Sequence, residues 1–291
     1  MAQHLPDISI RQLEYLVAVA DAPTWATAAT HVGVSASALS QGLAELERRV
    51  GVDLFEPQGR RRVLRGDAGP VLDHARQVVA LTGDLVRWAE RVRSAATGRI
   101  RIGMIDVAAV DHYPDVLRTF RSDRPDIDLT LSVAPSAALL ADLRAGALDI
   151  VICVDPPAPV PGVDVVRLRR EPLVVIAPAD ADIREASTWG PWVLFPDGSH
   201  TRHRIVEHLA RLGAPLRLAA ESHQASVIRE MVALGLGWTV LPDGPDLADD
   251  RLVRGPVLFE RDLVVATRSN AAPSPATDAL VGDIARSEGL G

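Results

Sequence analysis

The spacing of apolar residues changes at Gly98, and this change limits the folds open to the chain. Before Gly98, apolar residues recur every three or four positions, which is the period of amphipathic helices. After it, short apolar runs alternate with helical stretches, a pattern typical of strands joined by helices. The 291 residues therefore predict an N-terminal all-α part and a C-terminal α/β part.

Three helices are expected in the first fifty residues. The first covers 9–21, and a short second helix covers 25–31. Gly33 marks a tight turn before a third helix, which Ser35 caps and Gly51 ends. Two helices separated by a short turn with glycine have the spacing of a helix-turn-helix.

A wing follows, with strands expected at 52–55 and 63–64 around a Pro57-Gln58-Gly59 turn and three arginines at 60–62. All 31 basic residues are Arg. The first 97 residues hold eleven Arg and eleven acidic residues, so the net charge of −7 lies in 98–291, with 20 Arg against 27 acids. A local basic patch at the wing therefore predicts attraction to phosphate in the first part only.

Residues 67–94 form one long predicted helix with a stripe at spacings of three and four. We expect this stripe to be the seam of a two-helix coiled coil that joins two copies of the chain. Packing of the same stripe on the helix's own domain is the alternative. The proposed dimerisation residues are Val71, Val78, Leu81, Leu85, Trp88 and Val92.

The C-terminal part predicts two α/β halves joined mid-sheet, with a cleft between them for a ligand. Strands are expected at 99–105, 127–133, 148–154, 163–167, 173–177, 192–194, 216–221, 238–241 and 263–267. Helices are expected at 113–121, 137–145, 201–212, 225–234 and 277–287.

Many residues in both parts of the chain form motifs at fixed spacing. In the N-terminal part they are Ile10-Arg11-Gln12-Leu13-Glu14-Tyr15-Leu16-Val17-Ala18-Val19-Ala20, Ala28-Ala29, Val34-Ser35, Ala38-Leu39-Ser40-Gln41, Leu46-Glu47, Gly51-Val52, Leu54-Phe55-Glu56, Arg61-Arg62-Val63 and Ala68-Gly69. In the C-terminal part they are Gly103, Leu143-Arg144-Ala145-Gly146, Leu148-Asp149, Gly235-Leu236-Gly237 and Leu241-Pro242. Together these positions resemble LysR-type transcriptional regulators.

The chain departs from the family's pattern at three places. Ala36-Ser37 stand where the family often has Gln-Pro, Gly42 replaces a long polar residue, and Gly66 replaces a threonine before the long helix. Asp67 is the substitute cap for that helix. We therefore expect a thinner set of base contacts, with more weight on the wing and on DNA shape.

The resemblance implies a winged helix-turn-helix in 1–66, a linker and dimerisation helix in 67–97, and an effector-binding α/β domain of two subdomains in 98–291. The last would be two-lobed and similar to periplasmic binding proteins. The implied function is a sequence-specific DNA-binding transcriptional regulator modulated by a small-molecule effector, and not an enzyme. Its expected partners are double-stranded DNA, the effector, further copies of the chain (a dimer or a dimer of dimers) and RNA polymerase.

The recognition helix would present short polar side chains to base edges, and Gln can bond adenine through two hydrogen bonds. Arg11 would contact phosphate, as the family's first helix does, and the wing arginines would contact phosphate or the minor groove. A capped, solvated helix start and a core role for Trp25 are the alternatives. The predicted DNA-binding residues are Arg11, Trp25, Thr27, Ser35, Ala36, Ser37, Ser40, Gln41, Arg60, Arg61 and Arg62.

Effector binding is expected where strands end and helices begin, because the free N–H groups of helix starts favour an anion. Arg202 would clamp a carboxylate; pairing of Arg202 with Glu207, and simple helix capping elsewhere, are the alternatives. The predicted effector-binding residues are Asp106, Val107, Ala108, Pro135, Ser136, Ser199, His200, Thr201, Arg202 and His223.

Other function classes find less support. The alternative function is an α/β solute-binding or enzymatic domain fused to a DNA-binding module. The motifs G-x-S-x-G, G-x-G-x-x-G and the P-loop do not occur, which counts against an enzyme. Cys153 is the one cysteine, and packing is its expected role. No metal site or cofactor is expected. The start of the chain lacks a secretory pattern and no 18-residue apolar run occurs, so we expect a cytoplasmic protein without membrane contact.

Overall fold

The structure is a computed structural model that describes residues 7–58, 61–94, 98–244 and 247–290. The chain forms two compact units, unit 1 mainly from residues up to Ser94 and unit 2 from most of the remainder. In the described ranges no helix is long and apolar enough to cross a membrane.

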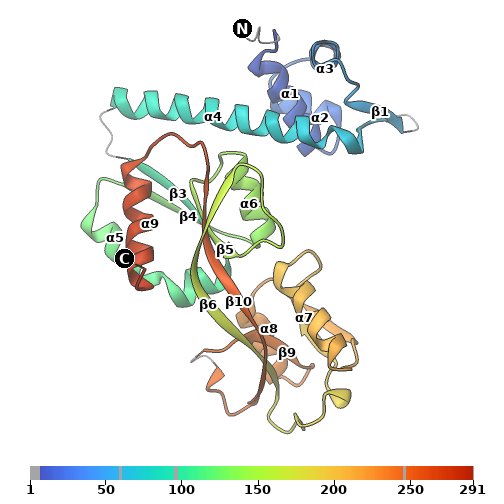
Figure 1. The fold of residues 1–291 in the computed structure, drawn as a ribbon, viewed down its shortest axis with the longest axis vertical. Coiled ribbons are helices and arrows are strands. Elements are labelled where there is room, and N and C mark those ends of the chain that lie inside the picture. The colour runs from blue at the N-terminus through green and yellow to red at the C-terminus, as the bar shows by residue number, and fades with distance from the viewer. Residues whose placement is uncertain (1–6, 59–60, 95–97, 245–246, 291) are drawn as a thin grey trace. The chain divides into compact units, whose positions relative to one another are not determined.

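Unit 1 contains the three expected helices, α1 (Ile10–Asp21), α2 (Trp25–His31) and α3 (Ala36–Val50) (Figure 1). Serine and threonine caps begin all three, and α3 ends at Gly51, whose φ of 81° favours glycine. Apolar residues on the inner faces of these helices are fully buried in one core, which contains Leu16, Leu39, Leu43 and Leu46. The helical spacing in the sequence therefore predicted these three helices correctly.

The strands of the wing lie closer to its tip than expected. Strands β1 (Phe55–Gln58) and β2 (Arg61–Leu64) pair antiparallel, with Pro57 opposite Arg62. Pro57 and Gln58 thus belong to a strand, which corrects the turn predicted at 57–59. A two-stranded ribbon has only edge strands, and an edge strand tolerates a proline that cannot donate a hydrogen bond.

The long helix α4 (Gly69–Ser94) follows a 3₁₀ turn, η1 (Gly66–Ala68). Its first turns pack on the core of unit 1, where Leu72 and Ala75 are buried. Val71 and Val78 of the predicted seam are half-buried against the same core, so they pack on the helix's own unit. Leu81 and Leu85 are exposed, whereas the side chains of Trp88 and Val92 lie outside the described residues.

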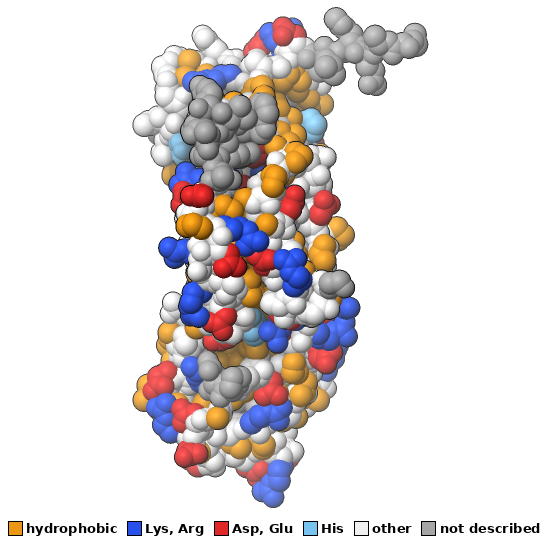
Figure 2. Space-filling view, turned by 90° about the vertical axis from the view of Figure 1, so that its left-hand side faces the viewer, with side chains coloured by type: hydrophobic (Ala, Val, Ile, Leu, Met, Phe, Trp, Pro, Cys, Tyr) orange, Lys and Arg blue, Asp and Glu red, His pale blue; other side chains and the backbone are white. Residues whose placement is uncertain are grey.

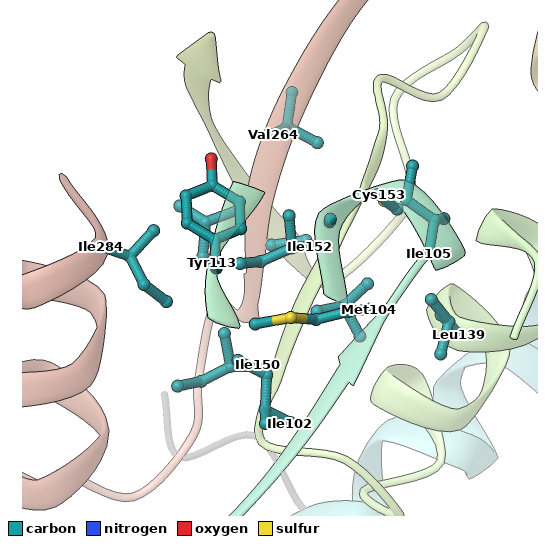
Figure 3. Close-up of a cluster of buried hydrophobic side chains, with 14 of the residues drawn as sticks. Ile102, Met104, Ile105, Tyr113, Leu139, Ile150, Ile152, Cys153, Val264 and Ile284 are labelled. Carbon is teal, nitrogen blue, oxygen red and sulfur yellow. The ribbon is translucent and has the colours of Figure 1, made fainter. Parts of the chain in front are cut away.

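Unit 2 has two lobes. Lobe 1 contains the parallel strands β4 (Asp128–Val133), β3 (Arg99–Met104) and β5 (Ile150–Val154) in that order. Figure 1 shows α5 (Pro114–Asp123) and α9 (Pro275–Ser287) on one side of these strands and α6 (Ser136–Arg144) on the other. A short π-helical turn, η2 (Ala108–His112), follows β3. Figure 3 shows the core of this lobe, in which Cys153 lies among isoleucine, leucine and methionine side chains.

Two long strands, β6 (Val163–Pro178) and β10 (Leu252–Arg268), pair antiparallel and run from lobe 1 into lobe 2 (Figure 1). β10 also pairs antiparallel with β5, whereas β3 pairs parallel with β4 and β5, so the six-stranded sheet is mixed. β6 replaces the two short strands predicted at 163–167 and 173–177. A single strand was not predicted because the charged residue Glu171 interrupts the apolar pattern, although it is buried in the middle of β6.

Lobe 2 is built on the far halves of these strands. β9 (Thr239–Pro242) pairs antiparallel with β6, and β7 (Trp192–Leu194) pairs parallel with β8 (Leu218–Glu221). A short 3₁₀ turn, η3 (Ala186–Thr188), precedes β7. Helices α7 (His200–Arg211) and α8 (Ala225–Ala233) pack in separate cores, through Leu209 beside Trp192 and through Ile228 beside Val193.

Candidate functional site

The start of α3 presents a group of small polar side chains to solvent. Ser35 caps the helix by accepting a hydrogen bond from the N–H of Ala38 at 3.2 Å, and its Oγ lies 3.0 Å from the Oγ of Ser37. The predicted base-reading residues of this helix are all exposed: Ser35, Ala36, Ser37, Ser40 and Gln41. The predicted base-reading residues therefore lie together at the solvent-exposed start of α3, which Ser35 caps.

Gly42, one of the departures from the family pattern, has a packing role. A Cβ atom built on Gly42 would lie 2.7 Å from two ring atoms of Tyr15, closer than side chains pack. Tyr15 is buried in the core of unit 1, and the guanidinium of Arg11 lies 5.7 Å from its ring centre. The aromatic ring therefore fills the space that a side chain at position 42 would need.

The predicted phosphate contacts differ in how free they are. Arg62 bonds the carboxylate of Glu47 at 3.2 and 3.3 Å, and its guanidinium lies over the rings of Trp25 and Phe55. Glu47 also accepts hydrogen bonds from the N–H groups of Leu54 and Phe55. Arg62 therefore braces the wing against α3, and with 45% of its side chain exposed its predicted contact with phosphate or the minor groove stays a prediction.

The other predicted contacts of unit 1 vary in the same way. Arg11 donates to the carbonyl of Val32 at 3.0 Å and is still half exposed. Thr27 is exposed, and its hydroxyl lies 2.8 Å from that of Thr24, whereas Trp25 is half-buried and packs edge-on against Phe55. Arg60 and the side chain of Arg61 lie outside the described residues.

A cavity of about 260 Å³ lies between the two lobes of unit 2. Lobe 1 contributes the turns after β3 and β4 and the end of β5, and lobe 2 contributes the starts of α7 and α8 and the end of β9. The lining residues are Ile105, Asp106, Val107, Val133, Ala134, Pro135, Ser136, Val154, Phe195, Ser199, His200, Thr201, His223, Gln224, Ala225, Pro242 and Arg261. The convergence of strand ends and helix starts is the arrangement that the sequence predicted.

Two of the predicted effector-binding residues lie away from this cavity. Ala108 is fully buried in η2. The guanidinium of Arg202 donates to the carbonyl of Phe195 at 2.6 Å and to Glu221 at 2.8 Å. One Nη is thus engaged on lobe 2 and Arg202 is not among the residues that line the cavity, which argues against the predicted ligand clamp. Its acidic partner is Glu221, and Glu207 instead pairs with Arg211.

The cation at the cavity is Arg261 of β10, which sequence reasoning missed. Its Nε donates to Glu171 of β6 at 2.8 Å, and one Nη donates to the hydroxyl of Thr201 at 3.0 Å. The side chains of Arg261 and Glu171 are each only 4% exposed. Between Glu260 and Asp262, Arg261 reads as part of a charged surface segment, and only the continuity of β10 brings it into the interior.

Glu171 is charged although it is buried. Burial by itself raises the pKa of a carboxyl group, but hydrogen bonding from His112 and the charge of Arg261 outweigh it and hold the pKa of Glu171 at about 2. Arg169 lies 3.0 Å from Nδ1 of His112. Because a guanidinium only donates, Nδ1 of His112 is the acceptor from Arg169, and its Nε2 contacts the carboxylate of Glu171.

Cys153 is fully buried in β5. Burial, together with the nearby charge of Asp155, raises the pKa of its thiol to about 12. Since the thiolate is the reactive form of cysteine, this side chain is an unreactive part of the core.

The arginines of unit 2 outside the cavity are largely matched with acids. Arg170 pairs with Asp262 at 2.9 Å and Arg251 with Glu230 at 2.8 Å. On the face drawn in Figure 2, blue Arg side chains lie beside red acidic ones instead of gathering in one patch.

Comparison with known proteins finds relatives of both units. Residues 10–69 match the family described as bacterial regulatory helix-turn-helix protein, lysR family, and residues 93–287 match the LysR substrate binding domain. A probable hydrogen peroxide-inducible genes activator of Streptomyces viridosporus is 32% identical, over 80% of this chain and 77% of that protein. The HTH-type transcriptional regulator CbbR of Rhodospirillum rubrum is 27% identical, with 97% of each chain covered.

The solved structure of full-length CbnR with its target DNA is similar over 96% of this chain and 99% of that chain. The TM-score is 0.56 and the sequence identity 20%, so this likeness establishes the fold alone.

Proposed function

The chain belongs to the LysR family of bacterial transcriptional regulators, and from this we propose how its parts divide the work. The protein is a DNA-binding regulator with an effector-binding domain. In the proposed division, residues 1–66 bind DNA, the helix in 67–97 joins two copies, and residues 98–291 bind the effector. The regulator works in the cytoplasm, and RNA polymerase is its partner at the promoter.

The cavity between the lobes carries the proposal of effector control. Its volume of about 260 Å³ lies near the lower end of the range for ligand sites, roughly 300 Å³, which favours a compact ligand. Apolar residues such as Val107, Val133 and Phe195 lie in it beside a few polar groups. Pockets with this mixture orient a ligand through the polar groups and hold it through the apolar ones.

Peroxide sensing, which the name of the Streptomyces relative suggests, is not part of the proposal. A disulfide-based sensor needs a second cysteine, and the chain has one. The thiol of Cys153 is buried, and its raised pKa keeps it protonated at neutral pH. A reversibly bound small molecule fits this chain better.

DNA recognition is assigned to the exposed start of α3, with Gln41 as the reader of a base edge. Arg11 and the wing residues Arg60 and Arg61 are assigned to phosphate or the minor groove. The test is a gel-shift titration with DNA flanking the gene and with random DNA of the same length. We expect Gln41→Ala to weaken specific binding about tenfold or more while random DNA is bound as before.

Arg61→Ala is the matched control for that titration. It should weaken both kinds of binding alike and flatten the salt dependence by about one unit, because it removes a phosphate contact. An unchanged ratio of specific to random affinity in Gln41→Ala would exclude Gln41 as a base reader.

A further inference from the structure

The charges around the cavity are more informative than its shape. Asp106 and Arg261 are the acidic and arginine side chains that line it. Arg261 is already neutralised by Glu171 at 2.8 Å. The carboxylate of Asp106 makes no hydrogen bond or ion pair with any residue that the structure describes, and the residue is half-buried. With neutral histidines, the cavity and the buried pair behind it therefore carry one net negative charge, located at Asp106.

Positive potential in the cavity comes from backbone groups on the lobe 2 side. α7 and α8 both begin at the lining, and both are long enough for the partial charge of a helix start. No side chain caps the start of α8, so the N–H groups of its first turn are available to an acceptor. Arg261 adds donors at the same cavity, because Glu171 and Thr201 engage only its Nε and one Nη.

We propose that the effector is a small zwitterion of the amino-acid class, with its ammonium group on Asp106 and its carboxylate at the helix starts beside Arg261. The proposal deepens the effector function above and rests on it. Asp106 belongs to lobe 1, whereas α7 and α8 belong to lobe 2, so the two charged groups of the ligand contact different lobes. A compact apolar side chain of the ligand would contact the apolar lining residues Val107, Val154 and Phe195.

A simple anion fits the cavity less well than a zwitterion. It would add a second negative charge near the uncompensated Asp106, and like charges in a partly desolvated site repel. A simple amine would satisfy Asp106 but leave the helix starts and the free donors of Arg261 without an acceptor. A ligand with both groups matches each charge of the cavity.

The test uses the full chain and matched sets of probes in thermal-shift assays, with titration calorimetry of the hits. The twenty standard amino acids are compared with their analogues that lack the amine, such as 4-methylpentanoate for leucine and 3-phenylpropionate for phenylalanine. Amines that lack the carboxylate, such as 3-methylbutylamine and phenethylamine, complete the sets. We expect at least one amino acid to bind and its two analogues to bind at least about tenfold more weakly, which is the loss of one charge-assisted hydrogen bond.

Asp106→Asn separates the role of the carboxylate from general effects on the cleft. This variant should lose the preference for the amino acid over its amine-free analogue, whereas Asp155→Asn, an exposed carboxylate outside the lining, should retain it. The class is wrong if no amino acid binds, or if an amine-free acid binds as tightly as its parent. Gel shifts of the same protein preparations report DNA binding independently, so a wrong ligand class is distinguished from a failed regulator.

Discussion

The buried ion pair of Arg261 and Glu171 adds little to the free energy of unfolding as a whole, but the loss of one of its members is costly. Removing Arg261 leaves the buried carboxylate of Glu171 with His112 as its remaining partner, and breaking a buried ion pair costs about 3–5 kcal/mol, whereas replacing both members with apolar residues costs little. We therefore expect Arg261→Met to lower the free energy of unfolding by about that amount. Urea titration followed by tryptophan fluorescence would measure it.

The double variant Arg261→Met with Glu171→Leu is the control for that measurement. It should recover most of the lost stability, since no uncompensated charge then remains. A double variant as unstable as Arg261→Met alone would mean that packing, and not charge, sets the cost.

Gly42 permits a second prediction for a single residue. Alanine is the better helix former by about 1 kcal/mol, but its Cβ would meet the buried ring of Tyr15 at 2.7 Å. The clash should win, because overpacking costs about 1–3 kcal/mol, and Gly42→Ala should therefore lower the melting temperature. In a Tyr15→Leu background the same change should raise it, and a drop in both backgrounds would point to a cause other than the ring.

Residue positions in the cleft were predictable where they depend on local chain chemistry. Three such residues lie where a strand ends and a helix begins: Ser136, Ser199 and Thr201. The end of an apolar run and a capping residue at a helix start can both be recognised in the sequence. Arg261 was not predictable, because its burial depends on a partner 90 residues away in the chain. Arg202 was wrongly predicted to face the ligand for a similar reason. Its partner Glu221 lies in β8, and only the folded chain brings β8 next to α7.

At the scale of elements, periodicity predicted helices well and long strands badly. α6 was expected at 137–145 and is found at Ser136–Arg144. β10 was expected only at 263–267, because Gly255 and Pro256 in its first half read as a turn. In the structure they coincide with irregular pairing between β10 and β6, where register shifts occur between Arg254 and Phe259.

The exposed stretch of α4 makes the dimerisation proposal testable. Leu81 and Leu85 are 38% and 62% exposed in the single chain, so aspartate there is tolerated by the monomer. At a helix–helix seam, by contrast, an unpaired charge costs several kcal/mol. Leu81→Asp with Leu85→Asp should therefore convert the dimer to monomer in analytical ultracentrifugation and abolish binding to an operator with two half-sites.

Val86→Asp is the control on the same helix, because Val86 is 52% exposed but lies off the predicted seam. It should leave the dimer intact. An unchanged assembly in the double variant would move the interface to another surface.

At the scale of the whole molecule, the charge division predicts separable activities. Residues 98–291 carry the entire net charge of −7, and their arginines are largely paired with acids. We expect this fragment alone to bind the effector but to leave random DNA unshifted even at low salt, whereas the full chain shifts it. Retardation of DNA by the fragment would contradict the assignment of DNA binding to the N-terminal part.

The two strands that cross unit 2 also determine how this unit comes apart. Leu168 and Val264 lie in the core of lobe 1, while Leu173 and Phe259 of the same two strands lie in a core of lobe 2. If one lobe unfolds, the other loses the pairing of the two shared strands, so we expect the two lobes to unfold cooperatively in spite of their separate cores. A ligand in the cleft therefore protects both cores from melting at once, including parts of each lobe that it never touches.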